Sequence, residues 1–307
     1  MIFNDKLKKI ATKLSPEIDR LMDIALEKQN HIGDLLLLKE NGFYEKKIAE
    51  YNKINTTKLN PHVIGPSHEG HSEHAHCLFI HKYRTNNIHK LSYKKYLEEI
   101  EYAPEKSNLI DKLIELEETT IQLEMLIYLK FWEADLIIKK LYQFVRILNG
   151  EHYDWYFKIS ESQRDKNSTG KRQDIIRLKI RDKLKKTSPL LYDLIKNTYK
   201  TQIRNSIAHS NYSFLGRNIH LNNHIEDDPN CQLETITFDE WIDIFHSTII
   251  FHNELIRMNN IINDYYRKMA MKHDNIFPIM VTEKDGKQYE LPLEYRPRFN
   301  DWKYKQI

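Results

Sequence analysis

The fold is decided by residues 104–148, PEKSNLIDKLIELEETTIQLEMLIYLKFWEADLIIKKLYQFVRIL. After Pro104 this stretch has no Gly or Pro, and Leu and Ile recur along it. Pro104 followed by acidic residues is typical of a helix start, and Asn149-Gly150 is typical of a helix end. We expect one helix of about 45 residues, or two helices with a break near Thr119-Thr120.

The composition of the whole chain also favours helices. Only 8 Gly and 9 Pro occur in 307 residues, and strands joined by tight turns need more of both. Cys77 and Cys231 are the only cysteines, so we expect no disulfide framework and a reducing, cytoplasmic location. The N-terminus carries charges where a signal peptide needs an apolar core, and no apolar run is long enough for a membrane-spanning helix. We therefore expect an all-α protein that makes no contact with a membrane.

Periodicity and punctuation divide the chain into three regions. Residues 1–100 are expected to form an N-terminal helical region, with helices at 5–30 and 31–56 followed by a His-rich loop. Residues 101–275 are expected to form a helical bundle, and residues 276–307 a C-terminal hairpin and tail. The segment 76–83 fits either a short strand or a buried helical turn.

Local signals place further boundaries inside these regions. Ser188-Pro189 predicts the start of one helix, and Thr237 with Glu240 predicts a capping box at the start of another long helix. Residues 213–235 contain helix-breaking residues and indicate an excursion with possible short strands. Asp285-Gly286 predicts a two-residue hairpin turn near the C-terminus.

The residues that point to chemistry are RNSIAH, 204–209. Histidine moves protons near neutral pH, and arginine holds an anionic phosphate. The spacing is weak evidence, because Arg followed by four to six residues and His occurs five times in this chain. The context is stronger. Asn205 and His209 lie four residues apart, on one face of a helix, and Ile203 with Ile207 forms an apolar pair that anchors the same turn.

Taken with the following SNY and the later helix that opens with DEW, this segment resembles the HEPN (higher eukaryotes and prokaryotes nucleotide-binding) superfamily. The resemblance covers about residues 105–272 and implies a HEPN-like helical bundle with an N-terminal helical extension. It also implies a metal-independent endoribonuclease of the phage-defence or toxin type that needs no cofactor. Arg204 and His209 would be catalytic, and Asn205 would support them.

The same resemblance implies partners. A homodimer would bring two copies of the motif into one cleft, and an antitoxin or regulatory protein is a possible further partner. The reaction expected is attack of the ribose 2′-OH on the adjacent phosphate, which leaves a 2′,3′-cyclic phosphate. A single His is poorly suited to act as both acid and base in one step. A second copy of the chain would supply the second His209, which gives a physical reason for the dimer.

RNA itself would be held by a basic segment. Residues 164–186 hold ten Lys and Arg against three Asp, which suits a phosphate backbone as well as a solvated helix face. Our candidates for substrate binding are Lys171, Arg172, Arg177 and Tyr212. Glu133 and Asp135 are either surface carboxylates or groups that orient the catalytic side chains.

Two alternatives stay open at this point. The chain fits a non-catalytic HEPN-like protein that binds RNA or a nucleotide, or acts as a scaffold. A histidine-dense cluster also contains metal-ligand types, but its spacing matches no structural zinc pattern, and we assign it no metal. Its members are His68, His71, His74, His76, Cys77 and His81. The aromatic and basic tail after Tyr295 is interpreted as a strap on the helices rather than as a stacking platform for RNA.

Overall fold

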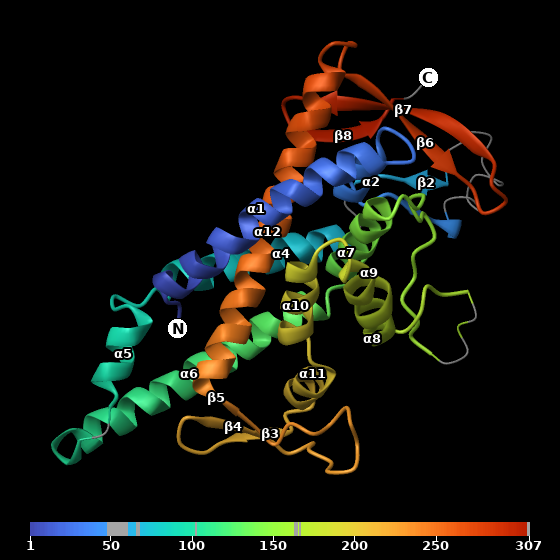
Figure 1. Ribbon diagram of the computed structural model, residues 1–307. Helices are drawn as coiled ribbons and strands as arrows, with labels where there is room; N and C mark the ends of the chain where they lie inside the picture. The colour runs from blue at the N-terminus through green and yellow to red at the C-terminus, as the bar shows by residue number, and fades with distance from the viewer. Residues whose placement is uncertain (48–60, 66–67, 102, 163–164, 166, 306–307) are drawn as a thin grey trace. The chain divides into compact units, whose positions relative to one another are not determined.

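The computed structural model describes residues 1–47, 61–65, 68–101, 103–162, 165 and 167–305 (Figure 1). The chain forms two compact units, each assembled from three separate stretches. Unit 1 comprises Met1–Glu17, His74–Ala134 and Leu190–Glu254, and unit 2 comprises Ile18–Glu73, Asp135–Pro189 and Leu255–Ile307. The division of the sequence into regions 1–100, 101–275 and 276–307 stays a prediction.

Helices carry most of the described chain. They are α1 (Asn4–Lys28), α2 (Asp34–Lys39), α4 (His68–Asn86), α5 (Tyr93–Glu99), α6 (Ser107–Trp132), α7 (Asp135–Leu148), α8 (Arg172–Asp174), α9 (Asp182–Leu184), α10 (Pro189–Thr198), α11 (Thr201–Ala208) and α12 (Phe238–Ala270), with a short 3-10 turn η1 (Pro104–Lys106) and a π-helical segment η2 (Ile175–Arg181). None of the helices in these described ranges is long and apolar enough to cross a bilayer.

The expectation of an all-α fold is wrong. Within the described residues the chain forms three small antiparallel sheets, which makes the fold a mixed one of helices and strands. The sheets are β1 (Phe43–Tyr44) with β2 (His62–Val63), β3 (Tyr212–Phe214) with β4 (Asn218–Leu221) and β5 (Thr235–Thr237), and β6 (Ile276–Thr282) with β7 (Gln288–Arg296) and β8 (Asp301–Tyr304). In β4 the side chains alternate, so that Ile219 and Leu221 are buried while their neighbours are not. This alternation extends over too few residues to be recognised in a sequence dominated by long helical patterns.

The long stretch 104–148 forms two helices, and its break lies later than Thr119-Thr120. α6 runs through both threonines, and the Thr119 hydroxyl donates to the Glu115 carbonyl at 3.0 Å within the helix. The break falls at Glu133-Ala134, where Glu133 caps the end of α6 and Asp135 opens α7. An acidic side chain in a first turn complements the partial positive charge of a helix N-terminus.

The N-terminal region confirms one expected helix and corrects another. The helix expected at 5–30 is α1. A helix over 31–56 is wrong where the chain is described, because α2 is short and β1 follows it; residues 48–56 lie outside the described residues. Gly33 and Asn41 adopt positive φ values of 123° and 51°, which end regular helix on both sides of α2.

The histidine-dense stretch is a helix and not a loop. Residues 68–86 form α4, in which Ile80 and Tyr83 are 2% and 5% exposed. The segment 76–83 therefore belongs to a helix and not to a strand. The many polar residues of this stretch obscure the helical spacing of its buried apolar residues, so the helix was not predicted from the sequence.

The core of unit 1 surrounds a buried carboxylate. Glu124 of α6 is fully buried and accepts hydrogen bonds from the Tyr83 hydroxyl and the Trp241 indole N–H, both at 2.8 Å. The Tyr128 ring packs near Trp241, with centroids 5.7 Å apart. Buried polar groups stabilise a fold only when they are bonded in this way, and this network fixes α4, α6 and α12 within the unit.

The C-terminal elements confirm the capping box and modify the hairpin. Thr237 Oγ1 accepts from the Glu240 N–H at 3.2 Å, and Glu240 Oε2 accepts from the Thr237 N–H at 2.8 Å. Between β6 and β7 the bond from the Glu283 N–H to the Lys287 carbonyl leaves a three-residue loop, which corrects the expected two-residue turn. The tail forms β8, where the Trp302 indole donates to Asn263 of α12 at 3.1 Å, as a strap would.

Candidate functional site

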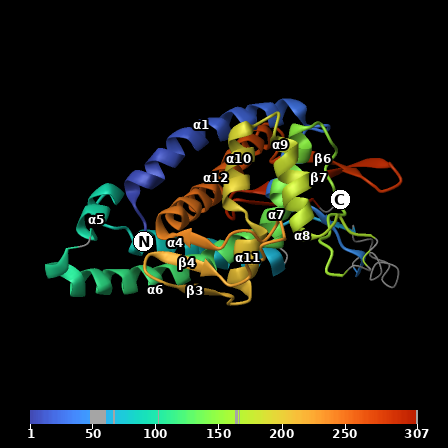
Figure 2. The same cartoon turned by 60° about the horizontal axis from the view of Figure 1, so that its bottom comes forward.

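The motif 204–209 lies at the C-terminal end of α11 in unit 1. α11 packs on α6 and leads directly into the sheet β3–β4–β5 (Figure 2). Ile203 and Ile207 are 1% and 8% exposed, so the expected apolar pair does anchor this turn. The His209 N–H donates to the Asn205 carbonyl at 3.0 Å, which places the two residues one turn apart on the same helix face.

A Schellman motif ends the helix and fixes the backbone at His209. Ser210 has a φ of 52°, its N–H donates to the Ile207 carbonyl at 3.2 Å, and the Asn211 N–H donates to the Ser206 carbonyl at 2.8 Å. The Ser206 hydroxyl donates to the Asn211 carbonyl and closes the same turn. His209 itself is exposed. Its backbone is therefore held in place while its imidazole faces solvent.

Arg204 is held by two neighbours within the same unit. Its Nε lies 2.5 Å from Oε1 of Glu133, the residue that caps α6, and its Nη1 donates to Asn205 Oδ1 at 2.8 Å. The Arg204 side chain is 20% exposed and that of Glu133 is 31% exposed, while the two contacting atoms, Nε and Oε1, are themselves buried. These two contacts engage Nε and Nη1, and Nη2 takes part in neither of them.

The wall behind Arg204 is aromatic. Tyr199 is 4% exposed, and its ring lies 5.1 Å from that of Trp132 at the end of α6. Burial raises the pKa of the Tyr199 hydroxyl, and the nearby Arg204 guanidinium opposes that rise. An apolar wall of this kind lowers the local dielectric constant and strengthens any bond that the guanidinium makes to an anion.

The segment after the motif is clamped to α6 and α12. Arg217, in the turn between β3 and β4, donates to both carboxylate oxygens of Glu117 at 2.8 and 2.9 Å and lies 3.0 Å from Asp239. Glu117 is only 2% exposed. Tyr212 is half-buried at the start of β3, with its ring 5.7 Å from that of Phe214.

These contacts also separate the motif from two of the other Arg–His pairs of the same spacing. Arg217, of the pair with His224, is used by Glu117. Arg146 pairs with Glu151 at 2.9 Å and donates to the carbonyl of its own partner His152 at 3.0 Å. Both arginines have structural roles, whereas Arg204 combines a positioned guanidinium with an exposed imidazole at a helix end.

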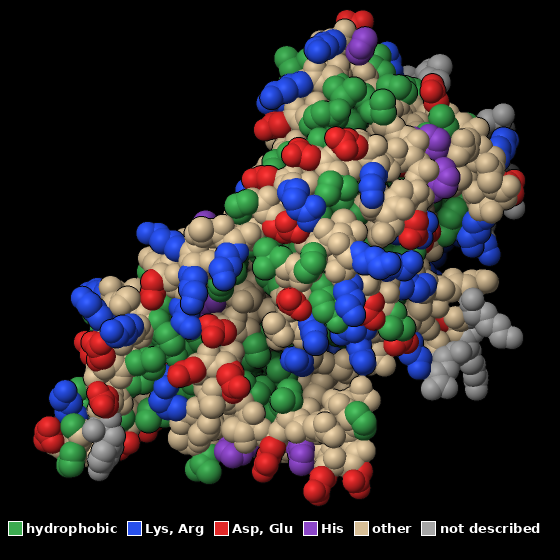
Figure 3. Space-filling view, in the orientation of Figure 1, with side chains coloured by type: hydrophobic (Ala, Val, Ile, Leu, Met, Phe, Trp, Pro, Cys, Tyr) green, Lys and Arg blue, Asp and Glu red, His purple; other side chains and the backbone are tan. Residues whose placement is uncertain are grey.

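The predicted substrate-binding residues other than Tyr212 lie in unit 2. Arg172 pairs with Asp135 at 2.7 Å, Lys171 is exposed just before α8, and Arg177 is half-buried in η2. The apolar face of this segment packs on α7 through buried isoleucines, and its Lys and Arg side chains gather over α8 and α9 (Figure 3). The structure thus brings Arg204 and Asn205 into contact and places His209 and Tyr212 nearby in the chain. The basic segment belongs to the other unit.

Sequence reasoning undervalued the two carboxylates at the break between α6 and α7. Glu133 and Asp135 each pair with an arginine that the sequence had singled out, Arg204 and Arg172 respectively. Their position beside the break between two helices could have identified them, but we expected that break near Thr119-Thr120.

The histidine-dense helix α4 provides one further pair of interest. Cys77 Sγ lies 3.6 Å from Nε2 of His252, and burial lowers the pKa of His252 to about 4. In the part of the chain that the structure describes, no three His, Cys, Asp or Glu side chains lie close enough to hold a metal ion. The side chain of His68 lies outside the described residues.

Comparison with known proteins adds no family to these observations. The chain matches no protein-family model, and no curated protein and no solved structure is similar enough to give a match.

Proposed function

We propose that this protein cleaves RNA without a metal ion, through Arg204, Asn205 and His209. The observation that carries the proposal is the arrangement at the end of α11. A guanidinium oriented by Glu133 and Asn205 stands on the same two turns of helix as an exposed imidazole. Arg holds the charge that grows on a phosphoryl oxygen, and His transfers a proton near neutral pH.

The reaction that suits these groups is attack of a ribose 2′-OH on the adjacent phosphate. His209 would take the 2′ proton, Arg204 would stabilise the charge on the non-bridging oxygens, and the bond to the 5′ oxygen would break to leave a 2′,3′-cyclic phosphate. The leaving 5′ oxygen needs a proton from a second acid. A second copy of the chain supplies another His209, so we propose that the active form is a homodimer with two motifs in one cleft. Action in phage defence or as a toxin belongs to the same proposal.

The test is cleavage of a fluorescent single-stranded RNA by purified protein in EDTA. Arg204→Ala and His209→Ala should each lower the rate at least about 100-fold, as loss of a proton-transfer or charge-stabilising group does. His224→Ala is the matched control, since His224 is also exposed, lies in the same unit and follows an arginine at the motif spacing. Mass spectrometry of the products should show a cyclic phosphate. Cleavage that survives both motif substitutions, or that EDTA abolishes, would overturn the proposal.

The dimer has its own measurement. Specific activity should fall on dilution in parallel with the loss of dimer in sedimentation, because one copy holds a single imidazole of the pair. Full specific activity in a protein that sediments as a monomer would contradict the composite site.

One observation favours a second candidate function, a non-catalytic protein that binds RNA or a nucleotide. Glu133 partly neutralises the charge of Arg204. A paired guanidinium stabilises the negative charge of a transition state less than a free one does, but it still binds an anion through hydrogen bonds. Under this alternative the wild-type protein retains RNA on a filter and yields no cleavage product, and Arg204→Ala weakens that retention.

A further inference from the structure

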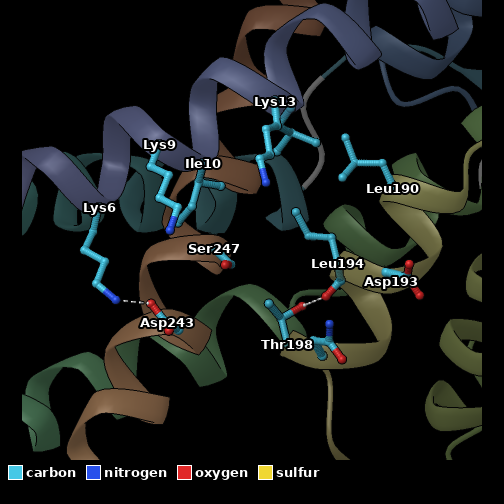
Figure 4. Close-up of a pocket in the computed structure, with 12 residues that line it drawn as sticks. Lys6, Lys9, Ile10, Lys13, Leu190, Asp193, Leu194, Thr198, Asp243 and Ser247 are labelled. Atoms are coloured by element: carbon cyan, nitrogen blue, oxygen red, sulfur yellow. Dashed lines mark hydrogen bonds and ion pairs between the residues drawn. The ribbon is translucent and has the colours of Figure 1, made fainter.

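A cavity of about 300 Å³ opens in unit 1 among the first half of α1, α10 and the first half of α12, apart from the RNSIAH motif (Figure 4). Its volume lies at the lower end of the range for small-molecule sites. The side chains that form it are Lys6, Lys9, Ile10, Lys13, Leu14, Leu190, Asp193, Leu194, Asn197, Thr198, Asp243 and Ser247.

Three lysines of α1 line one side of this cavity. Lys6, Lys9 and Lys13 are spaced three and four residues apart, so they share a helix face and descend together toward the opening (Figure 4). The Lys6 ammonium donates to Asp243 at 2.7 Å. Among the residues that the structure describes, no hydrogen bond or ion pair engages the ammonium groups of Lys9 and Lys13. Two positive charges at the cavity are therefore uncompensated by a direct partner.

The opposite walls are mixed. Leu190 and Leu194 of α10 face the cavity together with Ile10 and the buried Leu14 of α1. Asn197 and Ser247 supply an amide and a hydroxyl at the same opening. Such a combination binds a molecule with an apolar body and one charged end, because the apolar part is removed from water while the charge meets lysine.

The carboxylates near the opening limit the charge of the ligand. Asp243 is already paired with Lys6, and Asp193 is exposed on α10. The lining holds three lysines against two aspartates, a net charge of +1. With Lys6 and Asp243 paired, the two remaining lysines carry a charge of +2, which only the exposed Asp193 offsets. A phosphate monoester carries about −1.5 to −2 at pH 7, which matches two ammonium groups better than a carboxylate does.

We propose that this cavity is a binding site for a small organic phosphate monoester with an apolar body. Its phosphate lies between Lys9 and Lys13, and its body rests on Leu190 and Leu194. The site is independent of RNA cleavage and is defined by its own residues.

The experiment is calorimetric titration of the full chain with phenyl phosphate. Lys9→Gln and Lys13→Gln should each weaken binding about tenfold, the loss of one charge-assisted contact worth about 1.4 kcal/mol. Lys8→Gln is the matched control, because it removes an exposed lysine of the same helix that does not line the cavity. Binding that Lys8→Gln weakens as much as Lys9→Gln would show general attraction to a basic helix and would overturn the site, as would the absence of measurable binding to the wild type.

Two further ligands separate the parts of the proposal. Inorganic phosphate lacks the ring and should bind at least tenfold more weakly than phenyl phosphate, and benzoate keeps the ring with a single charge and should also bind more weakly. Equal affinity for phosphate and phenyl phosphate would refute the apolar wall. Leu190→Asn, at a position already 36% exposed, should weaken phenyl phosphate and leave inorganic phosphate unchanged. A normal melting temperature shows that each variant is folded.

Discussion

Glu117→Gln is expected to destabilise unit 1 strongly, although it changes one atom type in one side chain. Glu117 is 2% exposed, and both of its oxygens accept from Arg217. The substitution removes the carboxylate charge and turns one of the two acceptor oxygens into an NH2 group that faces the guanidinium N–H. The half-buried guanidinium then keeps Asp239, which is 51% exposed, as its charged partner. The clamp between α6, α12 and the β3–β4 turn then depends on a solvent-screened contact.

The magnitude follows from the burial of the two partners. Removing one member of a buried ion pair costs about 3–5 kcal/mol, whereas an exposed pair contributes about 0–1 kcal/mol. Because Arg217 is 23% exposed and keeps Asp239, we expect the lower end, about 3 kcal/mol. The pair Lys6–Asp243 is a matched control: its cation is also 23% exposed, but its carboxylate is 63% exposed. Asp243→Asn should therefore cost less than about 1 kcal/mol.

The assay is urea unfolding followed by circular dichroism for wild type, Glu117→Gln, Arg217→Met and the double variant. The double variant should lose at least about 1 kcal/mol less unfolding free energy than the two single variants lose together, because neither Glu117 nor Arg217 is then left as a charge without its partner. A loss below about 1 kcal/mol for Glu117→Gln, or strict additivity in the cycle, would refute the reasoning that burial makes this pair stronger than the Lys6 pair.

Three further predictions concern helix ends and pH. Ser210→Gly should raise the free energy of unfolding by about 0.5 kcal/mol, because glycine adopts the positive φ of 52° without strain; urea midpoints that fall instead would contradict it. Thr237→Val keeps the side-chain shape but removes the capping oxygen and should cost about 1 kcal/mol in the same assay; an unchanged midpoint would contradict the capping role. Burial lowers the pKa of three histidines to about 4: His62, His246 and His252. Between pH 4 and 6.5 the folded protein then binds fewer protons than the unfolded chain, so stability falls as pH is lowered through that window and is fully present above it. Asp34, whose pKa burial raises to about 6, has the opposite effect, as do Glu40 and Glu118, whose pKa values burial also raises. We expect the three histidines to outweigh these carboxyls, because each imidazole becomes protonated in the unfolded chain from about pH 6.5 downwards; equal or greater stability at pH 5 than at pH 7 would contradict the net fall.

Elements with long periodic patterns were predictable from the sequence. α1 and α12 were both expected, and the capping box at Thr237 was located to the residue. These signals act over neighbouring residues, so the sequence contains them completely. Within the motif, the burial of Ile203 and Ile207 was predictable for the same reason.

Features that depend on distant partners were not predictable. The break at Glu133-Ala134 carries no Gly or Pro, and α4 has its apolar positions dispersed among histidines. The partner of Arg204 required knowledge of which part of α6 lies against α11. The sequence predicted the hairpin β6–β7 and possible short strands in 213–235, but it did not indicate β1, β2 or β8, because runs of two to four residues are difficult to separate from a buried helical turn.

The contact between Glu133 and Arg204 has a consequence for conformational entropy. A free arginine side chain loses about 2 kcal/mol of rotamer freedom when it is ordered. In this protein that loss occurs on folding, because Glu133 and Asn205 already fix the guanidinium, so it does not subtract from the affinity for an anion. Glu133→Asp keeps the charge but shortens the arm, which moves part of the entropy loss to the binding step and should weaken anion binding by up to about tenfold. Because of the ion pair at the end of α6, the entropy cost of ordering Arg204 belongs to folding and not to ligand binding.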